Sequence, residues 1–478
     1  MRVDLSFMRA ALDGARIFYQ GCEITDLSSF PKNIKNLNTE VGISFDSREF
    51  IEQDFFIALK GARVDGHQFV QEVVLKGASG VLVSDESLVH TLNTQECLIV
   101  LVPDTYKALI DLAKAWRKLI TCPVVGITGS IGKTSTKEII REILKISGVN
   151  YYVSLRNQNT FIGLCANILR IPQDLQVAIL EVGISEPGEM ISKSDILRPT
   201  MGVITLIAHS HISQFGSIKT IANEKRQLFA HFGENNIGII CGDQSFLLDQ
   251  CYFHPVARYG FKTINQVQAR RIKTINDSAG NLKTSFILKS FDNKTFVKIN
   301  GYHKGLIYNM LAACAVANFL KIPFECVTKA LENFNSFSHR FQSRVIKNNR
   351  GVIISDCYNA NPESTRAALD AFKYYKWDGQ KIIILGDMKE LGIKERYWHR
   401  YIGRVVSKLS GVSKVITVGQ LAKDINKVLP ESLNSVWAQD WSGACNYLED
   451  FLKNSPALVL IKASHSMSLD NITDHFCE

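Results

Sequence analysis

Short, continuously apolar runs alternate with amphipathic stretches along most of this chain. A parallel strand buried on both faces reads as an unbroken apolar run, whereas a helix against a sheet repeats its apolar residues every three to four positions. The pattern therefore predicts an α/β protein built on parallel sheets. The predicted strands are 54–61, 77–83 (a turn and strand), 97–102, 124–128, 176–182, 202–207, 237–241, 352–356, 381–385, 413–418 and 457–461, and the predicted helices include 69–75, 106–120 and 133–144.

These elements divide into three predicted domains. Residues 1–120 form a small α/β domain, 121–337 a central P-loop domain with a parallel sheet, and 338–478 a Rossmann-like α/β domain. The last segment has no G-x-G-x-x-G after its first strand, which argues against a dinucleotide cofactor.

The strongest local signal follows the strand at 124–128. Glycines in a tight loop let the backbone approach phosphate oxygens, and the helix start beyond supplies unpaired N–H groups. Lys133 is placed to reach the β- and γ-phosphates, and the Thr134 hydroxyl to ligate Mg²⁺. Ile127 stands where the usual first glycine of a P-loop lies, so an ordinary strand–turn–helix corner stays as the alternative. The loop and helix start comprise Gly129, Ser130, Ile131, Gly132, Lys133, Thr134 and Ser135.

Polar residues at other strand ends are candidates for the same site. Glu181 ends a buried strand, where a carboxylate is costly unless it is paired or holds a metal. A Mg²⁺ role is favoured over a turn cap because of the P-loop upstream. His209 and His211 follow the next strand; such histidines are often structural, but two beside a phosphate site favour a ligand role.

Other polar residues keep two interpretations. Local chemistry favours solvated loop charges for Ser47, Arg48 and Lys60, with anion binding as the alternative. Spacing predicts that Lys225 is a surface lysine. The remaining candidates are Asn309, a polar member of a small-residue helix, and Asp356 and Asp387, which are either ligand-edge groups or helix N-caps.

Composition and charge narrow the class of protein and the partners to expect. The 478 residues carry a net charge of +9 without a basic stripe, which does not favour a nucleic-acid partner. The 11 cysteines include no C-x-x-C pair, as expected for reduced thiols in a cytoplasmic protein. The chain start lacks the apolar core of a signal peptide, and no apolar run reaches membrane-spanning length.

Taken together, several motifs resemble the Mur ligases, ATP-dependent enzymes that form amide bonds in peptidoglycan precursor synthesis. The resemblance covers nearly the whole chain. It is sharpest to the branch of the family that adds a dipeptide. The motifs are Thr128-Gly-Ser-Ile-Gly-Lys-Thr134, Glu181-Val-Gly183, His211-Ile-Ser-Gln-Phe-Gly216, Lys225, Asn309, Ser44-Phe-Asp-Ser-Arg48, Phe56-Ile-Ala-Leu-Lys-Gly61, Asp65-Gly-His67, Asp356-Cys-Tyr-Asn-Ala-Asn-Pro362 and Leu385-Gly-Asp-Met-Lys-Glu-Leu-Gly392.

The resemblance implies the reaction. A cytoplasmic, monomeric ligase would use ATP and Mg²⁺ to join D-alanyl-D-alanine to UDP-N-acetylmuramoyl-tripeptide through an acyl phosphate, releasing ADP and phosphate. The 1–120 domain would bind the UDP precursor and the 338–478 domain the dipeptide. No nucleic-acid partner and no stable membrane insertion are implied.

The resemblance also implies residue roles. Lys133 would bind phosphate, with Thr134, Glu181 and His211 as metal ligands and Lys225 as a carbamylated one. The implied nucleotide contacts are Gly129, Ser130, Gly132, Lys133, Thr134, Ser135, Asn309 (adenine), Arg340 (γ-phosphate) and Asp356 (ribose), and the implied substrate contacts are Ser47, Arg48, Lys60, Asn157, Asn159, Asn359 and Asn361.

Four stretches depart from the family pattern. Thr160 replaces an asparagine after Asn159, and Ile184-Ser185 replaces Ala-Asn after Glu181-Val-Gly183. Gly301-Tyr-His-Lys304 replaces Gly-x-His-Asn, with extra residues before Asn309. Lys462-Ala-Ser-His465 replaces Lys-Gly-Ser-Arg. These differences bear on substrate and adenine contacts more than on the chemistry.

Two other functions remain open. One is a sister Mur ligase, or a folylpolyglutamate-type ligase, that adds a single amino acid; the Tyr358-Asn-Ala-Asn361 stretch argues against it. The other is a P-loop nucleotide switch. A guanine-specific switch would usually carry Asn-Lys-x-Asp, which the chain lacks.

Overall fold

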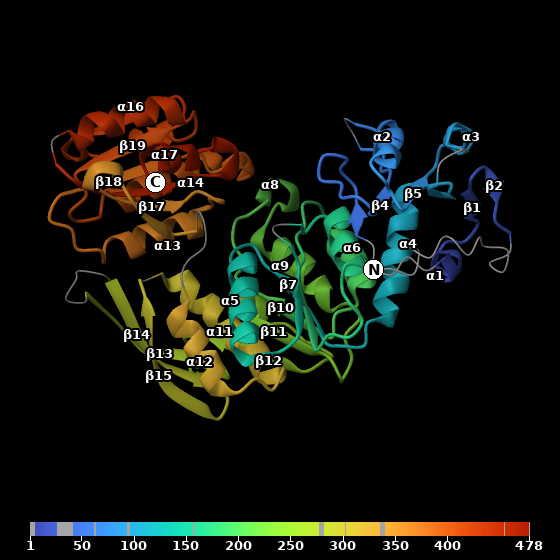
Figure 1. Cartoon of the computed structure of the whole chain (residues 1–478). Coiled ribbons are helices and arrows are strands. Elements are labelled where there is room, and N and C mark those ends of the chain that lie inside the picture. The colour runs from blue at the N-terminus through green and yellow to red at the C-terminus, as the bar shows by residue number, and fades with distance from the viewer. Residues whose placement is uncertain are drawn as a thin grey trace. The chain divides into compact units, whose positions relative to one another are not determined.

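The computed structural model describes residues 5–25, 42–61, 64–92, 96–155, 158–276, 282–301, 303–334, 340–453 and 455–477. Helices and strands alternate in it, and the strands form three sheets (Figure 1). Two compact units can be distinguished. Met1–Gly126, Asn150–Val182 and Ser192–Pro199 make up the first, and Ile127–Val149, Gly183–Ile191 and Thr200–Glu478 the second.

The first sheet has the strand order β2-β1-β6-β5-β4-β3. Strands β3 to β6 are parallel and β1 and β2 antiparallel. Phe56, Val73 and Val81 are fully buried in its core. Its strands are β1 Arg16–Tyr19, β2 Cys22–Glu23, β3 Ile43–Ser44, β4 Phe55–Ile57, β5 Gly80–Val83 and β6 Leu98–Leu101, and its helices α1 Leu5–Ala11, η3 Gly66–Phe69, α2 Val70–Leu75, α3 Ser87–Thr91 and α4 Thr105–Leu119.

The second sheet has nine strands in the order β15-β14-β13-β12-β11-β10-β7-β9-β8. Its strands are β7 Val124–Thr128, β8 Tyr151–Val153, β9 Val177–Glu181, β10 Met201–Ile204, β11 Ile237–Cys241, β12 Val256–Gly260, β13 Val267–Asn276, β14 Leu282–Ser290 and β15 Asn293–Asn300. The helices of this region are α5 Lys133–Ser147, α6 Phe161–Leu169, α7 Glu189–Leu197, α8 Ile212–Phe215, α9 Ile218–Arg226, η4 Gln227–Phe229, α10 Ser245–Leu248, α11 Lys304–Phe319 and α12 Phe324–Asn333.

Strands β13, β14 and β15 form an antiparallel meander that the sequence analysis did not predict. The signal was present in the sequence. Residues 282–300 alternate between buried and more accessible side chains around a turn at Asp292, as a hairpin with one covered face requires.

The third sheet has the order β16-β17-β21-β18-β19-β20. Alternate residues of a strand point to opposite faces, so Ile353 and Ile384 enter one core cluster and Ile354 and Ile383 the other. Its strands are β16 Gln342–Val345, β17 Gly351–Asp356, β18 Gln380–Gly386, β19 Lys414–Val418, β20 Ser435–Ala438 and β21 Ala457–Lys462, and its helical segments η5 Lys347–Asn349, α13 Pro362–Phe372, η6 Gly392–Lys394, α14 Glu395–Val406, α15 Lys423–Asn426, η7 Glu431–Leu433, α16 Trp441–Leu452, η8 His465–Met467 and α17 Asp470–Phe476.

The predicted strands and helices are confirmed, although several are shorter than predicted. The strand predicted over 54–61, for example, is Phe55–Ile57. The prediction of an α/β fold on parallel sheets is therefore correct for the core of each sheet. Within the described ranges, no helix combines the length and the apolar character that crossing a membrane requires.

Candidate active site

The loop between β7 and α5 has the backbone geometry of a phosphate cradle. Gly129 and Gly132 both have positive φ, 151° and 93°. A Cβ at Gly129 would lie 1.8 Å from the Thr205 hydroxyl, and one at Gly132 would lie 2.1 Å from the Asn309 side-chain oxygen. Both positions therefore require glycine, for conformation and for space.

The residues that directly follow β10, the strand beside β7 in the sheet, brace this loop. The Thr205 hydroxyl lies 3.1 Å from the Thr128 carbonyl and 2.7 Å from the Ile131 carbonyl, and the Ser130 N–H donates to the Leu206 carbonyl at 2.8 Å. Lys133 Nζ donates to the Gly129 carbonyl at 2.9 Å, so the lysine folds back over the loop.

This loop fits a nucleotide phosphate. The Ser130 and Thr136 hydroxyl oxygens are buried and have no hydrogen-bond partner, and the N-terminus of α5 opens at Gly132. Buried polar groups are normally satisfied, so two unsatisfied hydroxyls beside a helix N-terminus indicate a missing polar ligand.

Arg340 and Asn309 approach the same loop from other elements. Arg340 donates to the Thr134 hydroxyl at 3.0 Å, and its guanidinium lies 3.7 Å from the centre of the Tyr358 ring. Asn309 on α11 is 6% exposed and is the neighbour of Gly132 named above. The structure thus brings these predicted nucleotide contacts to Gly132 and Thr134.

The predicted metal ligands have varied surroundings. Glu181 is 2% exposed and accepts from Asn159 Nδ2 at 2.9 Å. His211 Nδ1 pairs with Glu390 at 2.7 Å, and this hydrogen bond lowers the pKa of Glu390. In the described part of the chain, no three His, Cys, Asp or Glu side chains cluster as a metal site would require. The metal assignments therefore stay predictions.

Lys225 is buried, contrary to the prediction from spacing. It lies on α9 and is only 3% exposed, whereas the spacing indicated a surface lysine. A buried lysine is rare unless it is paired or modified, so its environment is compatible with a functional role.

His209 makes contacts that differ from those of a metal ligand. Its Nδ1 pairs with Glu363, its backbone N–H donates to the same carboxylate at 3.2 Å, and its ring lies 4.5 Å from Trp398. The sequence analysis placed His209 near phosphate and missed this partner, which lies 154 residues away.

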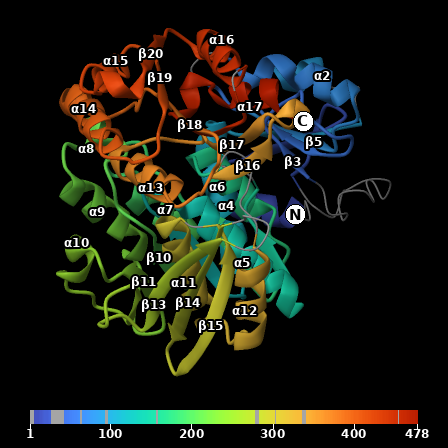
Figure 2. The same cartoon turned by 90° about the vertical axis from the view of Figure 1, so that its left-hand side faces the viewer.

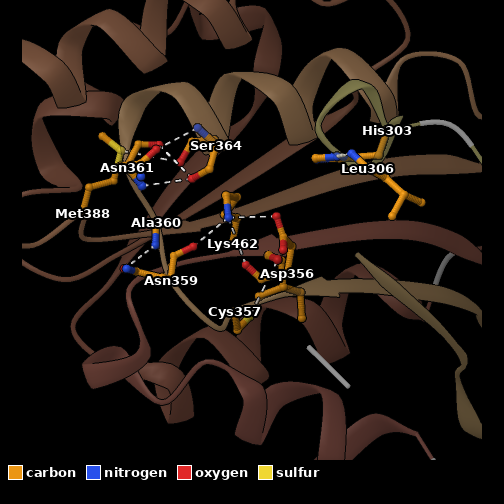
Figure 3. Close-up of polar contacts among 12 residues, drawn as sticks. His303, Leu306, Asp356, Cys357, Asn359, Ala360, Asn361, Ser364, Met388 and Lys462 are labelled. Carbon is orange, nitrogen blue, oxygen red and sulfur yellow. Dashed lines mark hydrogen bonds and ion pairs between the residues drawn. The ribbon is translucent and has the colours of Figure 1, made fainter. Parts of the chain in front are cut away.

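Beyond β17, side chains of the third sheet form a second polar centre, shown in Figure 3. Lys462 is 2% exposed; its Nζ lies 2.8 Å from Asp356 Oδ2 and donates to the Asn359 carbonyl at 2.8 Å. Asn361 caps α13 through a reciprocal capping box with Ser364. Asp356 is thus an ion-pair partner, and Asn361 has a defined structural role as well as a predicted substrate role.

Asp387 belongs to the neighbouring loop. Its Oδ1 accepts from the N–H groups of Leu421 and Ala422 at 2.9 and 2.8 Å, and its Oδ2 pairs with Lys389 at 2.8 Å. Asp387 therefore fixes the backbone before α15, but the N-cap of that helix is Ala422, so the N-cap alternative for Asp387 is wrong.

The departure from the family pattern at Lys304 lies at the start of α11. His303 is the helix N-cap and accepts from the Leu306 N–H at 3.2 Å, and burial lowers its pKa. Lys304 Nζ lies 5.3 Å from the centre of the Phe261 ring. A cavity of about 530 Å³ lies here, lined by Phe261, Ala269, Arg270, Arg271, Ile272, Thr274, Lys304 and Tyr374.

The candidate precursor residues lie mostly in the first unit. The Asp46 carboxylate holds Arg48 at 2.5 Å, and the hydrogen bond from Arg48 lowers the pKa of Asp46 to about 2. Ser47 is buried, and Lys60 forms a backbone bridge with Asp65. Asn157 lies outside the described residues. Arg48 is exposed and already ion-paired, as the solvated-charge interpretation expects.

Three segments of the chain match parts of one protein family. Residues 41–117 match the Mur ligase family catalytic domain, 127–317 the Mur ligase middle domain, and 339–465 the Mur ligase glutamate ligase domain.

Relatives and solved structures agree with these matches. UDP-N-acetylmuramoyl-tripeptide–D-alanyl-D-alanine ligase of Bacillus subtilis is 32% identical over 91% of this chain and 93% of its own length. MurF of Acinetobacter baumannii aligns with a TM-score of 0.82 over 99% of both chains at 24% identity. MurF ligase of Thermotoga maritima, solved with ADP, aligns at 0.78 over 94% of this chain and 98% of its own at 25% identity.

The likeness to the Acinetobacter structure supports the fold. The family assignment rests on the three domain matches and on the relative from Bacillus subtilis, which covers nearly the full length of both chains. The chain belongs to the Mur ligase family.

Proposed function

We propose that this chain is an ATP-dependent ligase that joins D-alanyl-D-alanine to UDP-N-acetylmuramoyl-tripeptide. The observation that carries the proposal is the 32% identity to a ligase of that name over 91% of the chain. The glycine loop, its unsatisfied hydroxyls and the Asp356–Asn361 run supply the local chemistry that such a ligase needs.

The reaction needs an activated carboxylate. In the proposed sequence, the tripeptide carboxylate oxygen attacks the γ-phosphorus of ATP, ADP leaves, and an acyl phosphate forms. The dipeptide amine then attacks the acyl carbon, phosphate leaves, and the amine loses a proton. Lys133 and the N–H groups of the loop neutralise phosphate charge, while Arg340 contacts the γ-phosphate from the side of Tyr358.

Mg²⁺ is the implied metal. The hard oxygen donors Thr134 and Glu181 suit one ion, and His211 with a carbamylated Lys225 would hold a second. When bound, the metal neutralises charge on the phosphates. Glu181 and Lys225 are both buried, which is compatible with these roles because charged side chains are seldom buried without a structural or functional reason.

Substrate contacts complete the proposal. Asn309 would contact adenine and Asp356 the ribose, with Ser135 at the helix start. Asn359 and Asn361 would contact the dipeptide. The UDP precursor would be bound by Ser47, Arg48, Lys60, Asn157 and Asn159.

The domain boundaries 1–120, 121–337 and 338–478 are part of the proposal, as are a monomeric state and a cytoplasmic location. ATP and the precursor would bind different domains, so closure of the domains would assemble the site.

The decisive experiment measures phosphate release from ATP and Mg²⁺ with UDP-N-acetylmuramoyl-tripeptide, with and without D-alanyl-D-alanine. We expect phosphate release to depend on the dipeptide. The product should be heavier than the precursor by the mass of two alanine residues. Release only with a single amino acid and a shorter precursor would indicate a sister ligase. No release with any precursor would contradict the ligase activity and favour a nucleotide switch.

A further inference from the structure

Strands β13, β14 and β15 have one face covered by helices and one open face. Helices α11 and α12 pack against the first, where Phe286 and Val297 are fully buried as a cross-strand pair. Residues paired directly across strands share a face, so the register identifies the residues of the other face. Figure 2 shows these three strands side by side in the lower part of the view.

The open face is strongly basic. Its residues follow from the cross-strand register, and none of them is Asp or Glu. We call this surface the basic face. It consists of Gln268, Arg270, Lys273 and Ile275 on β13, Lys283, Ser285, Ile287 and Lys289 on β14, and Lys294, Phe296, Lys298 and Asn300 on β15; Gln268 and Ser285 are buried.

The charges of the basic face are not balanced internally. Lys289 lies directly opposite Lys294, an arrangement of like charges that destabilises a strand pair. Among the described residues, Lys273, Lys289, Lys294 and Lys298 form no ion pair with a carboxylate. A bound anionic surface would remove this repulsion.

Protection of a sheet edge explains only part of the pattern. Lysines on an edge strand discourage strand addition, which accounts for Lys294 and Lys298 on β15. Lys273 and Lys289 lie on the inner strands β13 and β14, where no edge is exposed. Their position on the same face requires another reason.

Apolar side chains lie among these cations. Phe296 is 62% exposed and Ile275 is 50% exposed, and Ile287 is the cross-strand partner of Phe296. An eight-residue strand spans about 27 Å, and three strands about 10 Å between the outer two, so the face is broad and shallow. Lysines around a few exposed apolar groups are typical of surfaces that lie on a lipid bilayer.

We propose that the basic face docks the protein peripherally on an anionic lipid membrane. The lysines would contact lipid phosphates while Phe296 and Ile275 enter the headgroup region. The apolar groups favour lipid over nucleic acid, because single-strand binding gains from aromatic stacking and isoleucine offers none. The proposal goes beyond the ligase activity and does not depend on it.

The test is sedimentation of the full chain with vesicles of phosphatidylcholine alone or with added phosphatidylglycerol. We expect binding only to the anionic vesicles, and weaker binding as salt screens the charges. The variant Lys289→Glu, Lys294→Glu and Lys298→Glu should bind up to about a hundredfold more weakly, since each of the three basic residues near an anionic surface contributes about a fivefold gain. Phe296→Ser should also lose binding.

A matched control has the same change in charge elsewhere: Lys118→Glu, Lys145→Glu and Lys408→Glu, all exposed residues outside the basic face. This control should keep vesicle binding, and both triple variants should keep substrate-dependent phosphate release measured without vesicles. The proposal is overturned if the wild-type chain ignores anionic vesicles at low salt, or if the two triple variants lose binding equally. Retention on single-stranded DNA without vesicle binding would likewise overturn it and indicate a nucleic-acid surface.

Discussion

The glycine loop at the start of α5 and the polar centre beyond β17 both lie where a strand ends, yet they are held in different ways. Backbone geometry makes the first: Gly129 and Gly132 adopt positive φ, and backbone groups of Leu206 brace the turn. Side chains from distant parts of the sequence make the second, since Lys462 reaches Asp356 and Asn359 across more than 100 residues.

The difference has a consequence for substitution. A backbone-built loop depends mainly on the residues that occupy it, with the Thr205 hydroxyl as its side-chain brace from outside. A centre built from side-chain pairs depends on each partner, and loss of one leaves the other buried and unsatisfied. We expect substitutions in the loop to reduce the catalytic rate. Substitutions in the polar centre should mainly reduce the free energy of unfolding.

The largest effect is expected for Lys133→Ala. Its amine is the only side-chain cation of the loop and would neutralise the transferring phosphate, so kcat should fall by about 1,000-fold or more. Substrate-dependent phosphate release measures this loss. Lys145→Ala, at the exposed end of the same helix α5, is the control and should keep activity. Near-normal turnover in Lys133→Ala would remove the loop from the mechanism.

Lys462→Met tests the polar centre and should reduce the free energy of unfolding by about 3 kcal/mol, the cost of leaving one member of a buried pair alone. Both side chains are largely buried, 2% and 15% exposed. Denaturant unfolding measures the change. The double variant Lys462→Met with Asp356→Asn should recover part of the loss, because no unpaired carboxylate remains. Equal stability of the wild-type chain and the single variant would show that the pair contributes little.

The contrast between the two centres also explains what the sequence could predict. The loop was predicted because its rules are local: a buried strand, glycines, and a helix start within a dozen residues. The third sheet was predicted as a set of strands for the same reason, and Ile353, Ile354, Ile383 and Ile384 confirm that both of its faces are covered.

The sequence did not predict the surroundings of side chains whose partners lie far along the chain. Spacing made Lys225 a surface residue because a nine-residue helix can turn one lysine inward, and the pattern does not reveal what receives it. The pairing of His209 with Glu363 spans 154 residues and has no local signature. The basic face could not be predicted from the sequence, because only the strand register shows that Lys289 lies opposite Lys294.

Arg340→Lys sharpens the comparison, since this residue connects the two centres. Its planar guanidinium contacts both the Tyr358 ring and the Thr134 hydroxyl, and an ammonium group cannot reproduce both contacts. We expect kcat/KM for ATP to fall by about tenfold, with stability nearly unchanged. The control is Arg344→Lys: Arg344 lies on the nearby strand β16 and pairs with Asp474 on α17. Equal kinetics of the two variants would contradict a role for the Arg340 contacts.

The smallest expected effect is the pH dependence of stability that arises from His399, which holds the loop after β18. His399 Nε2 accepts from the Met388 N–H at 2.9 Å, while Nδ1 lies 2.7 Å from the Glu395 carbonyl, an arrangement that needs the neutral ring. Burial lowers the pKa of His399, so below about pH 6.5 the unfolded chain binds the proton first and acid reduces stability. The contribution is at most about 1.4 kcal/mol per pH unit, and it ends once pH reaches the lowered pKa of the folded state.

Urea unfolding between pH 7.5 and about pH 5 measures this dependence. His399→Asn should be less stable at neutral pH but should lose less stability on acidification than the wild-type chain. Burial also lowers the pKa of His303, so part of the wild-type slope should persist in the variant. Parallel stability curves for the two proteins would mean that His399 takes up its proton without loss of the Met388 contact. The loop after β18 would then accept a charged ring at His399 without a loss of stability.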